Sequence, residues 1–148
     1  MISFSASTDI AATPAVIWRL MTEPLSEPEW MRAVDSVTFI GGATEYAVGA
    51  RMRRSGAFLW ITMTWESEIT AFEPERLAVF EHVGGSLKGE SRWELSPTES
   101  GCRVTLSSTG LAPGPLAWVP ALAAAGGRIG LRSDLSRLKS VAEAASAE

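Results

Sequence analysis

Apolar and polar residues alternate along much of the chain, most clearly between residues 58 and 72. Apolar residues occupy most odd positions of this run, whereas threonine and glutamate occupy most of the even positions. A period of two is the pattern of a β-strand with one buried and one solvated face. The side chains predicted to point inward are Leu59, Ile61, Met63, Trp65, Ser67, Ile69 and Ala71.

Shorter segments of the same kind predict the other strands, at 3–10, 34–40, 50–55, 76–83, 87–95 and 102–111. Glycine pairs and prolines separate most of them, as is usual for hairpin turns. In the segment 87–95, charged residues alternate with apolar ones, so Trp93 is predicted to face the interior. The segments after residue 34 therefore predict an antiparallel meander.

Helical signals lie near both ends of the chain. Thr13 before Pro14 is a typical helix start, and Ser26 with Glu29 has the spacing of a capping box in front of a second short helix. The tail from about residue 115 to 145 predicts one long amphipathic helix that lies on the sheet. Its apolar positions are Leu131, Leu135, Leu138 and Val141 or Ala142. The expected class is α+β, with two short helices after the first strand.

The composition places this pattern in one ordinary globular domain. The chain has 148 residues, 46% of them hydrophobic and 20% charged, so we expect a single domain over residues 1–148. A net charge of −4 offers no basic surface for nucleic acid. One cysteine and one histidine exclude a disulfide framework and the usual zinc sites, so we expect no metal and no cofactor.

The longest uncharged stretch, residues 104–127, is interrupted by glycine and proline, so we expect no stable membrane insertion. The N-terminal segment lacks the features of a signal peptide, which favours a cytoplasmic protein. Arginine far outnumbers lysine and alanine is abundant, which fits a bacterial coding sequence. The sequence leaves open whether the protein is a monomer or a homodimer.

Four short motifs, Pro14–Trp18, Pro28–Trp30, Trp65–Pro74 and Leu135–Lys139, follow one another along the chain. In order and spacing they resemble the polyketide cyclase/dehydrase-like branch of the START/Bet v 1 (SRPBCC) superfamily, over nearly the whole chain. The resemblance implies a helix-grip fold, in which a curved antiparallel sheet of about six to seven strands wraps around a long C-terminal helix. It also implies an apolar cavity that holds lipids, sterols, polyketides or similar ligands.

Large aromatic, sulfur-containing and a few polar residues are the expected lining of that cavity. The predicted ligand-binding residues are Met63, Trp65, Phe80, His82, Ser91, Trp93, Trp118 and Leu122. Gly126, Gly127 and the neighbouring alanines make the long helix thin, which leaves room for a ligand. For each aromatic residue, plain packing in the core is the competing interpretation.

Candidates for catalysis are few. His82 is the first, because a neutral imidazole is the usual general acid or base near neutral pH. His82 is also interpreted as a polar cavity group that hydrogen-bonds a ligand, or as an ordinary strand histidine. The pattern does not show which face of 76–83 is wet. The basic cluster Arg51, Arg53 and Arg54 can anchor a ligand carboxylate or lie on the surface. Glu66 and Glu68 lie two residues apart on one strand face, a spacing that can pair carboxylates for acid–base catalysis. The pattern of that face instead indicates contact with solvent.

Three functions follow from these observations. The first is a carrier that binds a small hydrophobic molecule such as a lipid or polyketide. The alternative is a cofactor-independent polyketide cyclase/aromatase or dehydratase that uses His82, with Ser91 or Arg53, in the same cavity. The third is a protein-interaction role of the co-chaperone or ribosome-associated type. Because one fold serves many activities, the residues of the cavity, and not the fold, must distinguish these three functions.

Overall fold

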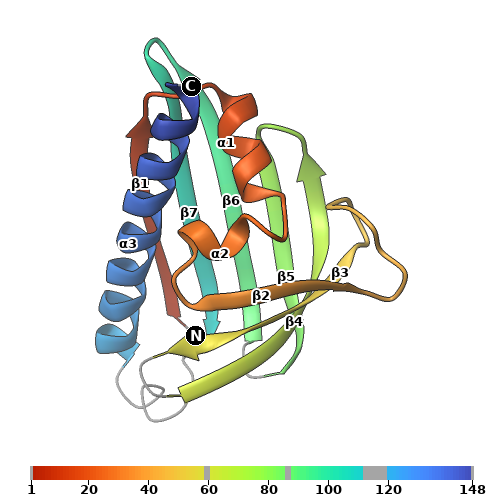
Figure 1. Ribbon diagram of the computed structural model, residues 1–148. Helices are drawn as coiled ribbons and strands as arrows, with labels where there is room; N and C mark the ends of the chain where they lie inside the picture. The colour runs from red at the N-terminus through yellow and green to blue at the C-terminus, as the bar shows by residue number, and fades with distance from the viewer. Residues whose placement is uncertain (1, 59–60, 86–87, 112–119, 148) are drawn as a thin grey trace.

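The computed structural model describes residues 2–58, 61–85, 88–111 and 120–147 (Figure 1). The predicted order of elements is confirmed. It runs β1 (Ile2–Ile10), α1 (Pro14–Met21), α2 (Glu27–Trp30), β2 (Val34–Ile40), β3 (Arg51–Phe58), β4 (Ile61–Glu73), β5 (Leu77–Gly85), β6 (Lys88–Thr98), β7 (Gly101–Leu111) and α3 (Pro120–Ser146).

All neighbouring strands pair antiparallel in one sheet, in the order β1-β7-β6-β5-β4-β3-β2. The first strand therefore closes the meander by pairing with the last. Figure 1 shows β2 and β3 curving round in front of β5 and β6, so the sheet is strongly bent. The helix α3 lies along β1 and also contacts α1 and α2, on the concave side of the sheet. The arrangement is the curved sheet and C-terminal helix that the sequence predicts.

The core lies between the concave face of the sheet and the three helices. Leu135, Leu138 and Ala142 bring the apolar stripe of α3 into it with at most 2% exposure each. These positions recur every three to four residues, which explains why this half of the helix packs tightly. Trp93 is 3% exposed, so its predicted inward orientation is confirmed.

The two short helices begin differently from each other. Thr13 caps α1 as predicted, because its Oγ1 accepts a hydrogen bond from the Val16 N–H at 3.3 Å. The predicted capping box at Ser26 and Glu29 is not formed, so this prediction is wrong. Ser26 has helical rather than extended backbone angles, so its side chain makes no capping hydrogen bond, and α2 ends after four residues at Trp30.

The strand β4 keeps its predicted inward face over Met63, Trp65, Ser67 and Ile69, all of which are buried. Near Ala71 the pairing with β5 shifts register. A bulge of this kind changes which side chains point inward. Ala71 is consequently only half-buried, and Phe72 packs against Trp18 with ring centroids 5.5 Å apart. Leu59 lies outside the described residues.

Candidate functional site

A cavity of about 220 Å³ lies between the sheet and the N-terminal half of α3. Its wall is mostly apolar and aromatic, with a few polar side chains and a strip of glycines from the helix. The lining residues are Phe4, Met31, Ala33, Val34, Arg54, Met63, Trp65, Phe80, His82, Ser91, Trp93, Ser108, Gly126, Gly127, Gly130, Leu131 and Asp134. They come from α3, from the segment between α2 and β2, and from every strand of the sheet, β1 to β7.

The glycines of α3 make room for this cavity. A Cβ atom at Gly127 would lie 2.5 to 2.7 Å from ring carbons of Phe4, which is too close for any larger residue without rearrangement. At Gly126 and Gly130 a Cβ would meet nothing within 4 Å. The helix therefore approaches the sheet at Gly127 and leaves open space on either side of it.

The structure brings six of the eight residues predicted to bind ligand to this one cavity: Met63, Trp65, Phe80, His82, Ser91 and Trp93. They project from β4, β5 and β6. Whether they hold a ligand stays a prediction. The face of β5 that the sequence left undecided is settled, because Phe80 and His82 line the cavity whereas Glu81 and Val83 are exposed.

Two predicted residues fall elsewhere. Trp118 lies outside the described residues. Leu122 is 59% exposed and does not line the cavity, so its placement there is wrong. The reason is helical geometry: the inward face of α3 passes through Ala123, Gly127 and Asp134 at spacings of four and seven residues, and Leu122 is one position off that face.

A chain of hydrogen bonds crosses the sheet within the cavity wall, where His82, Ser91 and Ser108 are lining residues. Ser67 Oγ on β4 lies 2.9 Å from His82 Nδ1, and His82 Nε2 lies 3.1 Å from Ser91 Oγ. Ser91 Oγ is in turn 3.4 Å from Ser108 Oγ on β7. Burial, helped by the positive charge of Arg54, lowers the pKa of His82 to about 4. His82 is therefore neutral at pH 7, with one ring nitrogen donating and the other accepting.

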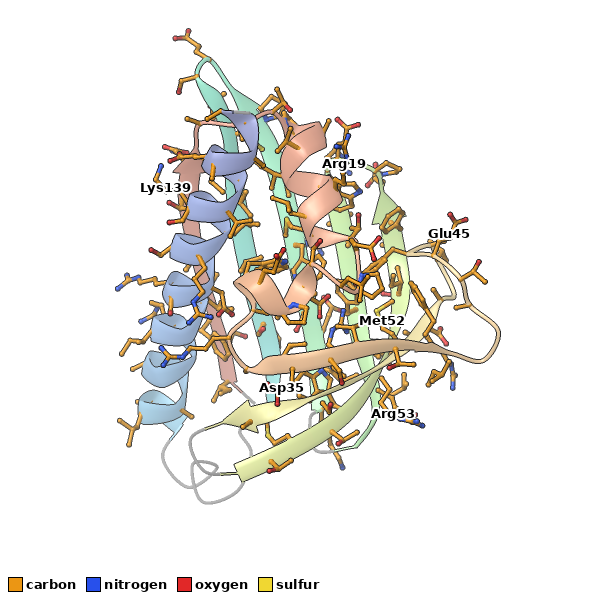
Figure 2. All side chains as sticks on the ribbon, viewed as in Figure 1. Arg19, Asp35, Glu45, Met52, Arg53 and Lys139 are labelled. Carbon is orange, nitrogen blue, oxygen red and sulfur yellow. The ribbon has the colours of Figure 1, made fainter. Side chains whose placement is uncertain are left out.

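The basic cluster at β3 divides between the two faces of the sheet. Arg51 and Arg53 point outward and pair with Glu68 and Glu66 at 2.9 and 2.7 Å. Figure 2 shows Arg53 pointing away from the sheet while its neighbour Met52 points inward. Arg53 cannot serve the cavity, so its suggested part in catalysis is wrong; successive residues of a strand point to opposite faces.

Arg54 shares the inward face with Met52 and is 3% exposed. Its Nε and Nη2 donate to the two carboxylate oxygens of Glu27 at 2.5 and 2.9 Å, and the Tyr46 hydroxyl donates to the same carboxylate at 3.1 Å. The guanidinium also stacks 4.9 Å from the centre of the Phe80 ring.

Burial and the charge of Glu27 shift the pKa values of Arg54 and Tyr46. Burial works to lower the pKa of Arg54, but the charge and hydrogen bonds of Glu27 outweigh it and raise that pKa. Burial, together with the Glu27 charge, raises the pKa of Tyr46. Sequence reasoning missed Glu27 and Tyr46 completely. One signal could have indicated the inward position of Arg54. This arginine lies two residues after the apolar Met52, and residues two apart on a strand share a face.

Asp134 is another polar residue that sequence reasoning missed. It is 9% exposed on the inward face of α3, and its Oδ1 accepts a hydrogen bond from the Arg32 backbone N–H at 3.1 Å. Burial raises the pKa of Asp134 to about 6, against the opposing effects of the Arg32 N–H and of Arg137. Its spacing from Leu131 and Leu138 is the signal that predicts the inward position.

Among the described residues, no group of three or more histidine, cysteine, aspartate or glutamate side chains is placed to hold a metal ion. No helix within the described ranges is long and apolar enough to cross a membrane.

The curved seven-stranded sheet, the C-terminal helix and the cavity between them define a helix-grip fold of the Bet v 1 type. The chain belongs to the family of polyketide cyclases/dehydrases and lipid transport proteins, whose model matches residues 1–143. The resemblance on which the sequence prediction rested is thereby confirmed. No curated protein matches the sequence.

Solved structures share the fold at low sequence identity. TTHA0849 from Thermus thermophilus is 21% identical with a TM-score of 0.76, over 97% of this chain and 99% of that one. Ara h 8.0201 is 12% identical with a TM-score of 0.70, over 96% and 97% of the two chains. DynU16, a protein of the dynemicin biosynthetic locus, is 16% identical with a TM-score of 0.72, over 99% of this chain and 49% of that one.

Proposed function

We propose that this protein binds a small hydrophobic molecule in the cavity between the sheet and α3. The observation that carries the proposal is the cavity of about 220 Å³ that aromatic and sulfur-containing side chains line. A cavity of roughly 150 Å³ with an apolar wall accommodates one benzene ring, so this one suits a molecule of one to two rings. The family's description, which joins polyketide chemistry and lipid transport, supports a ligand of this kind.

The apolar wall supplies part of the affinity. An aromatic group of this size buries about 200 Å² of surface, which is worth about 5 kcal/mol. Such a gain corresponds to a dissociation constant near the millimolar range, before the cost of ordering is counted. Tighter binding therefore depends on the polar groups in the wall, and these set the orientation of the ligand.

Calorimetric titration with naphthalene, an uncharged two-ring probe, tests the proposal. We expect binding at one site per chain. Ser108→Phe places a ring in the cavity and should weaken binding about ten-fold or more, a loss of about 1.4 kcal/mol. The matched control is Ser107→Phe, which adds the same ring on the opposite face of β7 and should leave binding unchanged. Absence of binding, or equal losses in the two variants, contradicts the proposal.

Acid–base catalysis in the same cavity, of the cyclase or dehydratase kind, is the second candidate. The observation that favours it is the presence of two titratable groups, Asp134 and His82, in one mostly apolar wall. Buried acids and bases with shifted pKa values are common where proton transfer occurs.

Exchange of the α-hydrogens of 2-tetralone, a two-ring ketone, in deuterated buffer measures this activity. Wild-type protein should accelerate the exchange, and Asp134→Asn should abolish the acceleration. An exchange rate equal to that in buffer alone removes the catalytic candidate and leaves the binding function in place.

A further inference from the structure

The positive charge that faces the cavity is already compensated. Both carboxylate oxygens of Glu27 accept hydrogen bonds from Arg54, and the two side chains are 0% and 4% exposed. A bidentate pair of this kind neutralises the guanidinium at the point where it enters the cavity wall. Arg54 therefore does not offer a free cation to a ligand.

The guanidinium of Arg54 still has hydrogen-bond donors available for a ligand. Its Nε and one of its terminal nitrogens, Nη2, are used by Glu27 and by the sulfur of Met52. The hydrogen bonds that Arg54 donates to described residues leave from Nε and Nη2, none of them from the other terminal nitrogen, Nη1. Arg54 is part of the cavity wall, and the Tyr46 hydroxyl also lies close enough to affect its pKa. A guanidinium carries five N–H groups, so a ligand oxygen can accept from it without displacing Glu27.

The remaining titratable groups in the wall do not attract an anion. His82 is neutral at pH 7 because burial and Arg54 lower its pKa to about 4. Asp134 has a pKa of about 6 and is mostly ionised at pH 7. No lysine and no second arginine is among the described lining residues. An anionic ligand would lose its hydration and gain no unpaired cation in return.

We infer that the cavity selects an uncharged molecule that accepts a hydrogen bond from Arg54, and that it discriminates against carboxylates although an arginine lies in its wall. The inference rests on the proposed binding function and narrows its ligand class. It excludes fatty acids and other carboxylates. It therefore argues against one of the two roles that the sequence left open for the arginine cluster, the anchoring of a ligand carboxylate. A one- to two-ring compound with a hydroxyl or carbonyl oxygen has the required chemistry.

Three probes of one shape test the inference on the wild-type protein: naphthalene, 2-naphthol and 2-naphthoate. Calorimetry near pH 7 should show 2-naphthol binding at least about ten-fold more tightly than 2-naphthoate. Binding of 2-naphthoate that equals or exceeds binding of 2-naphthol overturns the inference. Naphthalene distinguishes a failure of this inference from a failure of the proposed binding function. If naphthalene binds and the other two probes bind equally well, the inferred ligand class is wrong and the binding function stands. If none of the three binds, the binding function fails and the inference with it.

Glu27→Gln tests the cause directly. It keeps the size of the side chain and one acceptor but releases the charge of Arg54, so the variant should gain affinity for 2-naphthoate relative to 2-naphthol by about ten-fold. Glu29→Gln, an exposed neighbour on α2, is the matched control and should keep the wild-type preference. If Glu27→Gln folds and keeps the wild-type preference as well, compensation by Glu27 is not the cause of the discrimination. If it does not fold, the comparison of the three probes on the wild-type protein still decides the inference.

Discussion

Replacing Asp134 by asparagine tests whether the wall of the cavity holds a buried acid. The variant keeps an oxygen that accepts from the Arg32 N–H but removes the ionisable group. Burial raises the pKa of Asp134 from 3.8 to about 6, so the folded protein holds this proton more tightly than the unfolded chain does. The stability that the protonated acid provides is fully present below pH 3.8 and is lost as the pH rises through about 6.

The magnitude follows from the same shift. Each pKa unit is worth about 1.4 kcal/mol, so the whole shift corresponds to about 3 kcal/mol. Partial access of solvent to the carboxyl group screens some of this, and we expect about 2 kcal/mol. The free energy of unfolding of Asp134→Asn, minus that of the wild type, should therefore rise by about 2 kcal/mol between a pH below 3.8 and a pH above about 6.

Urea denaturation at a series of pH values measures this difference. Asp35→Asn, which removes an exposed carboxylate from β2 (Figure 2), corrects for the loss of a surface charge. If the difference between Asp134→Asn and the wild type, after this correction, is flat across pH, Asp134 is not a buried acid in the folded protein. A fall instead of a rise would mean that the ionised form is the stabilised one.

Three further predictions concern the same region. Glu27→Ala should cost about 3 to 5 kcal/mol of stability in urea denaturation, because it leaves a buried guanidinium without its partner; a cost below about 1 kcal/mol contradicts the buried pair. Gly130→Ala should stabilise by up to about 1 kcal/mol in thermal unfolding, since its Cβ meets nothing, whereas Gly127→Ala should destabilise by crowding Phe4. The opposite order would refute the close approach of α3. His82 is the only histidine, so its NMR signals report one titration, which we expect near pH 4; a midpoint near 6.5 contradicts its burial.

Local periodicity accounts for how well the fold could be predicted. Period-two segments marked each strand, and the predicted bounds of β2, residues 34–40, match those observed. The errors occur where pairing or packing overrides local preference. Ala71 loses its inward position to a register shift between β4 and β5, and Ser26 does not cap α2 because its own backbone already has helical angles. Neither event has a signal within its own segment.

The candidate site could be predicted in part. Aromatic and sulfur-containing residues on inward strand faces are recognisable one strand at a time, and those predicted on β4, β5 and β6 meet at one cavity with their polar neighbours His82 and Ser91. The prediction that Leu122 lines the cavity failed because a helix of small residues has a weak apolar stripe. The sequence of such a helix does not define which of its faces points inward. Asp134 and Arg54 were missed as buried groups because charged side chains are expected on the surface unless a partner is visible.

By itself the sequence determined the class, the order of elements and the apolar inventory of the core, because these depend on the alternation of neighbouring residues along each segment. Only the tertiary structure decided the electrostatics of the cavity. Glu27 and Arg54 are 27 residues apart, and Asp134 reaches the Arg32 backbone across 102 residues. Burial and partner together set the charge of such groups, and both arise only when the sheet closes over α3.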